Sequence, residues 1–163
     1  MKAMVLSCML VLLSCPWLAS AGTLGPTAAS QVVTLRMTSD HCAGAENVFA
    51  FDEQLTPSAT RQPFTVPSKQ VFVLTQVRAA LVAVQGSPLG SAGSAGILIA
   101  NSSGDQTIDE VQASPDSSGN FTLNVNFSPG VVIGSGSLPC ISTFGTKYGI
   151  LDAHAFGFMA KDK

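Results

Sequence analysis

Apolar and polar residues alternate without a break between positions 120 and 127. A period of two places every second side chain on the same face of an extended chain, so this pattern predicts a β-strand with one buried and one solvated face. Turn-forming residues precede it at 116–119 and follow it at 128–130, where we expect the strand to end. The apolar face consists of Phe121, Leu123, Val125 and Phe127, and the polar face of Asn120, Thr122, Asn124 and Asn126.

A second strand is predicted over 71–84, where β-branched residues are frequent. Its first part is apolar on both faces, and Gln76 and Arg78 then mark a polar side. Strands of this length are uncommon, so a bulge or a turn is expected near 78–80. One helical turn at the alanines of that stretch is the alternative interpretation.

The rest of the chain continues as short extended segments separated by turn residues. No segment shows the 3.6-residue period of an amphipathic helix. Glycine and serine dominate 85–96, which we interpret as an exposed loop between two strands. Together these patterns predict an all-β fold, an antiparallel β-sandwich or jelly roll of about eight or nine strands. The remaining predicted strands are 31–37, 46–51, 96–100, 107–113, 130–133, 138–143 and 147–160, with turns at 56–58, 66–68, 102–105 and 134–136.

Residues 1–21 have the features of a secretory signal peptide. A lysine at position 2 precedes an apolar run, and Ala19 and Ala21 occupy the small-residue positions of a cleavage site. The apolar run is shorter than the roughly 20 residues that cross a membrane. Cleavage after Ala21 leaves 22–163 as a single β-sandwich domain, secreted or periplasmic. The alternative is a lipid anchor at Cys15, because the residues before it loosely resemble a bacterial lipobox.

Low charge is the main feature of the composition. Charged residues make up 11% of the chain, whereas typical globular proteins contain about 25%. Eight basic residues face ten acidic ones, and no basic cluster occurs that would neutralise phosphates. No segment after the signal peptide is long and apolar enough to span a bilayer. The composition therefore excludes a nucleic-acid partner and a transmembrane segment.

Cys42 and Cys140 are the two cysteines that follow the signal peptide. Two thiols in an oxidising compartment usually pair, so we predict a disulfide between them. A catalytic or redox thiol is the alternative. Neither cysteine belongs to a C-x-x-C motif, which favours the disulfide.

Three segments resemble strands of uncharacterised secreted bacterial β-sandwich proteins. Residues 66–75, with the sequence VPSKQVFVLT, are similar to a strand entry of the form VPxGxxxVLT. Residues 138–140 and 154–158 are similar to the last two strands of such chains. The resemblance implies a sandwich fold and carries no known activity.

Candidate chemistry centres on the last predicted strand. Asp152 and His154 share one of its faces because residues i and i+2 point the same way, and Tyr148 is expected on that face too. The other histidine, His41, is distant in sequence. A metal site needs about three protein ligands and no third is indicated, so neither a metal nor another cofactor is predicted. We interpret the pair as a surface hydrogen-bonded pair; the alternative is a small exported hydrolase that uses Asp152 and His154 as an acid–base pair.

The polar face of the 120–127 strand is the candidate binding face. It presents a row of neutral donors and acceptors suited to a sugar or to another protein's strand, although an uncommitted polar surface is the alternative interpretation. We therefore predict a secreted, non-catalytic β-sandwich with a binding or assembly role outside the cytoplasm. Its partner is an unknown extracellular ligand or protein, with a homo-oligomer as one option. The candidate residues are Asn120, Thr122, Asn124 and Asn126.

Overall fold

A computed structural model describes most of the chain after the predicted signal peptide. The predicted signal peptide, Cys15, His41 and residues 85–92 of the predicted loop lie outside the described residues. Cleavage after Ala21 and lipid attachment at Cys15 therefore stay predictions. The described residues are 25–26, 28–38, 42, 48–83, 93–101, 104–113, 115–144 and 148–162.

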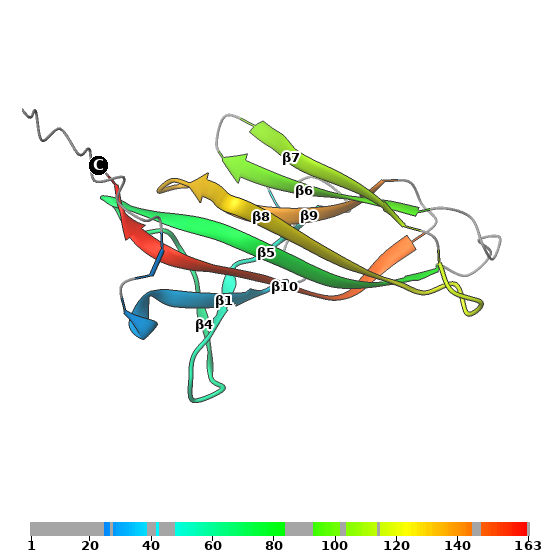
Figure 1. The fold of residues 1–163 in the computed structure, drawn as a ribbon, viewed down its shortest axis with the longest axis horizontal. Helices are drawn as coiled ribbons and strands as arrows, with labels where there is room; N and C mark the ends of the chain where they lie inside the picture. Colours follow the sequence, from blue (N-terminus) through cyan, green and yellow to red (C-terminus); the bar gives the residue numbers. More distant parts are fainter. Residues whose placement is uncertain are drawn as a thin grey trace, which may run out of the picture.

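Within these residues, ten strands form two antiparallel sheets that pack face to face (Figure 1). The larger sheet has six strands in the order β4-β3-β1-β10-β5-β8, and the smaller has four in the order β2-β9-β6-β7. The antiparallel β-sandwich predicted from the sequence is therefore confirmed. A short 3-10 turn, η1 (Ala29–Gln31), precedes the first strand. The strands are β1 Val32–Arg36, β2 Val48–Ala50, β3 Glu53–Leu55, β4 Arg61–Pro63, β5 Gln70–Ala83, β6 Gly93–Asn101, β7 Gly104–Ala113, β8 Phe121–Ile133, β9 Leu138–Phe144 and β10 Tyr148–Lys161.

The hydrophobic core lies between the two sheets, where their inward side chains meet. In β8, Phe121, Leu123 and Val125 are buried while the residues between them are exposed, which confirms the predicted alternation. Full burial of a large aliphatic or aromatic side chain contributes about 1.5–3 kcal/mol, so this layer is the main stabilising element. Its largest fully buried side chains include Leu35, Phe51, Phe72, Leu74, Val77, Leu81, Ile97, Ile133 and Ile141.

β8 continues through the turn residues at 128–130, so the predicted end of the strand there is wrong. Its pairing with β5 is interrupted between Asn126 and Val131 and then resumes. Gly130 has a φ of 115°, a conformation that favours glycine. A Cβ atom at this position would lie 2.7 Å from Cγ1 of Val73. The turn-forming residues therefore bend one long strand, as in a bulge, where two strands were predicted.

β5 is one continuous strand of 14 residues. Its own bulged residue is Thr75, whereas the sequence pattern predicts a bulge or turn near 78–80; opposite Ala80 and Leu81 the register also shifts, but the extra residue lies in β10. The pairing of β5 shifts register at Thr75 with both of its neighbours, β8 and β10. The Thr75 hydroxyl donates a hydrogen bond to the carbonyl oxygen of Phe156, over 3.0 Å. Next to it, a Cβ atom at Gly157 would overlap the backbone of β5 and lie 2.7 Å from the Phe72 ring. β10 therefore approaches β5 closely beside the bulge, and the helical alternative is wrong because the whole stretch is a strand.

The edges of the sheets depart from the predicted pattern. β3 and β4 were not predicted, because strands of three residues are too short to show a period. They form a hairpin around the predicted turn at 56–58, in which the amide of Thr56 donates to the carbonyl of Thr60. β6 begins at Gly93, inside the predicted loop 85–96, where small residues pair with β7 and β9. The described residues therefore form ten strands, against eight or nine predicted.

A disulfide joins Cys42 to Cys140, as predicted. Their Cα atoms are 6.3 Å apart, and both residues are buried. Cys140 belongs to β9 and pairs with Ala50 of β2, so the bridge ties the segment before β2 to the middle of the smaller sheet. No helix within the described ranges is long and apolar enough to cross a membrane.

Candidate binding face

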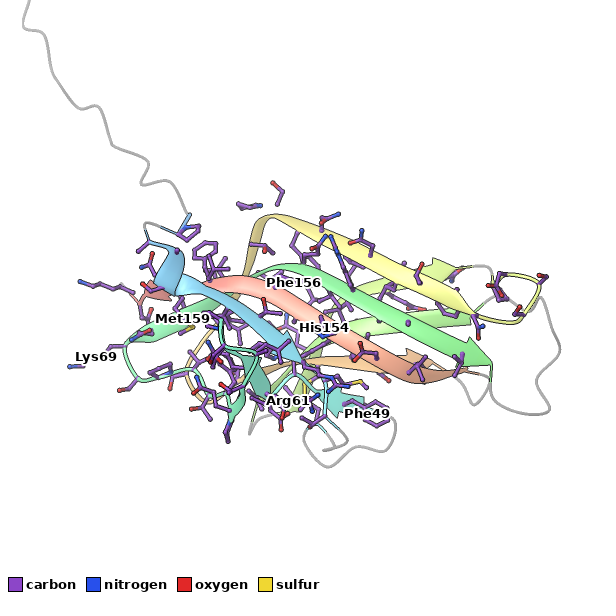
Figure 2. All side chains as sticks on the ribbon, turned by 90° about the horizontal axis from the view of Figure 1, so that it is seen from below. Phe49, Arg61, Lys69, His154, Phe156 and Met159 are labelled. Carbon is purple, nitrogen blue, oxygen red and sulfur yellow. A yellow bond between two sulfur atoms is a disulfide. The ribbon has the colours of Figure 1, made fainter. Side chains whose placement is uncertain are left out.

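One side of the six-stranded sheet points away from the smaller sheet, and we call it the outer face. Figure 2 shows β1, β10, β5 and β8 running side by side there, with His154 and Phe156 on β10. The register pairs Arg36 with His154, His154 with Arg78, and Arg78 with Asn124. Paired residues of antiparallel strands project to the same side of a sheet. These four side chains, which we call the central row, therefore form one line across four strands.

Asp152 contacts two members of the central row. The Nε atom of Arg36 lies 3.3 Å from Oδ1 of Asp152, and Nδ1 of His154 lies 3.6 Å from Oδ2. The i, i+2 spacing thus places Asp152 and His154 on one face, as predicted. A register shift falls between Ile150 and Asp152. The side chain of Tyr148 lies outside what the structure describes, so its place on this face stays a prediction.

The predicted polar row of β8 lies on the outer face, and two of its members form an amide network. Nε2 of Gln76 donates hydrogen bonds to Oδ1 of Asn124 and to Oδ1 of Asn126, over 2.9 and 2.8 Å. Both asparagines thus accept with their oxygens, and within the described residues their NH2 groups form no hydrogen bond. Thr122 pairs with Ala80 nearer the start of β8, and Asn120 directly precedes the strand, where its backbone amide donates to Asp116.

Arg78 is exposed but stacked against an aromatic ring. Its guanidinium carbon lies 5.5 Å from the centroid of the Phe156 ring. The His154 ring approaches the same phenylalanine, with centroids 6.3 Å apart. A guanidinium over an aromatic face keeps its N–H edge available for ligands, and the contact restricts its motion. Phe156 therefore holds Arg78 in place between His154 and Asn124.

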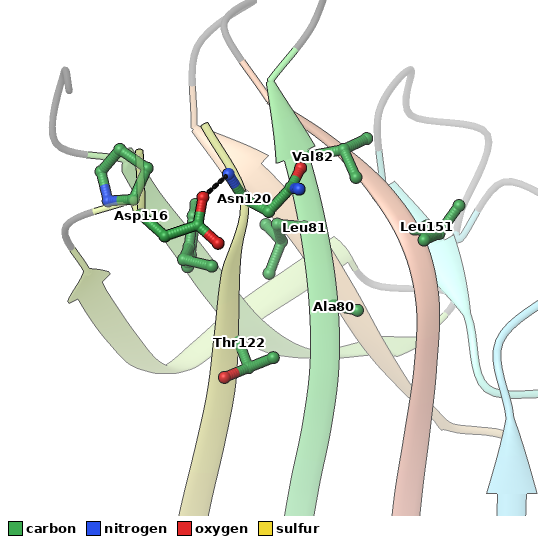
Figure 3. Close-up of a pocket in the computed structure, with 9 residues that line it drawn as sticks. Ala80, Leu81, Val82, Asp116, Asn120, Thr122 and Leu151 are labelled. Carbon is green, nitrogen blue, oxygen red and sulfur yellow. Dashed lines mark hydrogen bonds between the residues drawn. The ribbon is translucent and has the colours of Figure 1, made fainter. Parts of the chain in front are cut away.

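Two shallow hollows adjoin on this face. The first, of about 490 Å³, includes Leu81, Asp116 and Leu151, with Asp116 accepting the hydrogen bond from Asn120 (Figure 3). The second, of about 510 Å³, is lined by both acidic and basic side chains, and we call it the Arg78 hollow. The two hollows share Ala80 and Thr122. The side chains that define the Arg78 hollow are Arg78, Thr122, Asn124, Asp152 and His154.

An apolar row crosses the same four strands at the other end of the outer face. Val32 pairs with Phe158, Phe158 with Val73, and Val73 with Val132. The two central members are 5% and 1% exposed, whereas Val32 and Val132 are both 55% exposed. Cross-strand pairs of this kind stabilise a sheet. The outer face thus combines a polar region and an apolar region on one surface.

The Asp152–His154 pair is the predicted alternative active site. The structure brings the two together beside a hollow, yet no hydrogen bond joins His154 to a serine, threonine or cysteine in the described part of the chain. A hydrolase of the nucleophilic type requires such a partner for the histidine. Among the described residues, no three His, Cys, Asp or Glu side chains converge on one point. The absence of a metal in the functional protein stays a prediction. It also concerns His41, which lies outside the described residues.

Sequence reasoning missed four residues of this site. Arg78 and Gln76 were used only to mark a polar side, and Arg36 and Phe156 were not singled out. A weak signal existed, because the arginines at 36 and 78 fall in predicted strands of a chain with few charges. Which strands are neighbours, and in which register, is not encoded in a local pattern.

No family model matches the chain, and no curated protein matches it. Among solved structures, the chain is similar to the Eiger TNF of S. frugiperda, at 8% identity and a TM-score of 0.49, covering 82% of this chain and 96% of that one. It is also similar to the globular domain of the zebrafish complement 1qA protein, at 12% identity and a TM-score of 0.44, covering 82% of this chain and 99% of that one. These are likenesses of β-sandwich architecture, which the strand pairing of this chain establishes by itself.

Proposed function

We propose that the protein is an exported, non-catalytic binding domain whose contact surface is the outer face of the six-stranded sheet. The observation that carries this proposal is the central row, in which polar side chains from four strands lie in register, Arg78 and Asn124 exposed and Arg36 and His154 partly exposed. Neighbouring groups hold them, since Asp152 contacts Arg36 and Gln76 contacts Asn124. A surface ordered before binding loses less conformational entropy when a partner docks.

The composition of the outer face supports the same role. Binding surfaces in proteins commonly combine an apolar part with a polar part that supplies hydrogen bonds and specificity. Here Val32 and Val132 are the exposed ends of the apolar row, and the NH2 groups of Asn124 and Asn126 form no hydrogen bond within the described residues. Export is supported by the signal-peptide pattern and by the Cys42–Cys140 disulfide, which persists in oxidising compartments.

Two matched cysteine variants, one on each sheet, test the proposal by allowing either surface to be blocked chemically. Asn124→Cys and Gln112→Cys each place one thiol on an exposed amide position of an edge strand, β8 of the larger sheet and β7 of the smaller one. A neutral polyethylene glycol chain attached to each thiol blocks one sheet without adding charge. The protein is then assayed for self-association by sedimentation velocity and for binding to an array of glycans and peptides.

We expect at least one interaction that is lost when Asn124→Cys is modified and kept when Gln112→Cys is modified. An interaction that survives both modifications equally would place the contact surface elsewhere. Turnover of an ester or glycoside by the purified protein, abolished in His154→Ala, would instead establish the hydrolase alternative. Asp152→Asn should then reduce the same turnover.

A further inference from the structure

We propose that the Arg78 hollow binds a carboxylate group flanked by hydroxyl groups, the chemistry of a uronic acid unit in a glycan. The inference rests on the proposed use of the outer face for binding and names the class of ligand. Within the outer face, Arg78 differs from the other arginines in its charge environment. Arg36 lies 3.3 Å from Asp152, and Arg61 lies 3.7 Å from Glu53.

Arg78 forms no ion pair with a carboxylate within the described residues. The guanidinium group is always ionised and its fork of N–H donors matches a carboxylate, with two parallel hydrogen bonds. Its contact with Phe156 holds it on the sheet without using those donors. Arg78 is thus an oriented cation for which none of the described carboxylates supplies a counter-ion.

The groups on both sides of Arg78 favour an acceptor ligand. Asn124 lies opposite it on β8, and because the Asn124 oxygen already accepts from Gln76, its NH2 group is the part available to a ligand. His154 lies opposite it on β10, where a ring nitrogen that carries a proton donates as well. A carboxylate placed over Arg78 would therefore meet hydrogen-bond donors on three neighbouring strands.

Asp152 determines which kind of anion the Arg78 hollow favours. It lines the same hollow and carries a negative charge close to the cations. A densely sulfated or phosphorylated chain would be repelled by this carboxylate, whereas hydroxyl groups would donate hydrogen bonds to it. Thr122 adds a hydroxyl that can donate or accept. One negative charge with hydroxyl groups beside it is the combination that satisfies all of these side chains.

The test uses NMR titration of isotope-labelled protein of residues 22–163 with trigalacturonic acid and with neutral galactotriose. We expect trigalacturonic acid to shift the signals of Asn124 and His154, and galactotriose to bind at least about tenfold more weakly. Arg78→Gln should weaken binding of the acid by at least about tenfold, and Arg78→Lys should weaken it less. Arg61→Gln is the matched control, since it removes an arginine of the same sheet outside the hollow, and it should leave binding unchanged.

Triglutamate and inorganic sulfate are the competing probes. Binding of triglutamate as tight as that of trigalacturonic acid would remove the role given to the hydroxyl groups, and tighter binding of sulfate would overturn the assignment. Equal binding of acidic and neutral trisaccharides, or no binding of the acid, would overturn it as well. If trigalacturonic acid does not bind but a different ligand loses its binding when Asn124→Cys is modified and not when Gln112→Cys is modified, the uronic acid assignment fails and the proposed binding face stands. If no interaction depends on that modification, both proposals fail.

Discussion

Arg36 and Asp152 lie 116 residues apart in sequence, yet the Nε atom of the first is 3.3 Å from a carboxylate oxygen of the second. The contact joins β1 to β10 near the centre of the outer face. Their side chains are 33% and 42% exposed, so water screens the attraction between them. The ion pair therefore orders the outer face more than it stabilises the fold.

A double-mutant cycle tests that role. Arg36→Gln, Asp152→Asn and the double variant should give a coupling energy of about 0.2–1 kcal/mol, because partly exposed ion pairs rarely contribute more. Urea denaturation measures the free energy of unfolding of each protein. A coupling well above that range would show that the pair is a main stabilising element.

The disulfide should contribute more than any ion pair of the outer face. Cys42 and Cys140 are separated by 98 positions, so the bridge closes a long loop and restricts the unfolded chain. We expect Cys140→Ser to lower the free energy of unfolding by about 2–4 kcal/mol. Thiol titration of the unfolded, unreduced mature protein should find no free sulfhydryl. Two free thiols per chain would contradict the structure.

Gly157 should not tolerate a larger residue. A Cβ atom there would overlap the carbonyl oxygen of Val73 and crowd the Phe72 ring, neither of which is free to move. We expect Gly157→Ala to lower the free energy of unfolding by about 1–3 kcal/mol. Gly134→Ala is the control, since a Cβ atom at Gly134 would meet no atom within 4 Å. Equal effects of the two substitutions would show that β10 can move away from β5.

The exported protein should begin at Gly22 and carry no lipid. Ala19 and Ala21 match the cleavage pattern of a signal peptide, and cleavage there removes Cys15. Intact-mass spectrometry of protein recovered after export measures the start of the chain. A diacylglyceryl adduct on Cys15 would instead establish the lipid-anchored alternative.

The purified protein should hold no stoichiometric transition metal. Zinc catalysis takes about three protein ligands, and the described residues supply Asp152 and His154 without a third. Elemental analysis of the mature protein measures the metal content directly. One equivalent of zinc or copper that disappears in His154→Ala would contradict the prediction and would support the hydrolase alternative.

Local patterns identified most strands because burial on a sheet alternates residue by residue. The alternation along 120–127 placed Leu123 inward and Asn124 outward, and the structure agrees. The same rule placed Asp152 and His154 on one face, since only a short stretch of β10 was involved. Beyond Ile150 a register shift interrupts the simple alternation, which a period of two cannot foresee.

The sequence by itself determined the fold class, the predicted disulfide and the polar face of β8, all of which depend on residue type and short-range period. The tertiary structure alone decided the strand order and the register, which bring Arg36, His154, Arg78 and Asn124 into one row. Register is set by how whole strands pack against a common core, and a slip of one residue would move every side chain to the opposite face. Local patterns contained pieces of the candidate site, such as Asp152 with His154, but only these pairings assemble it.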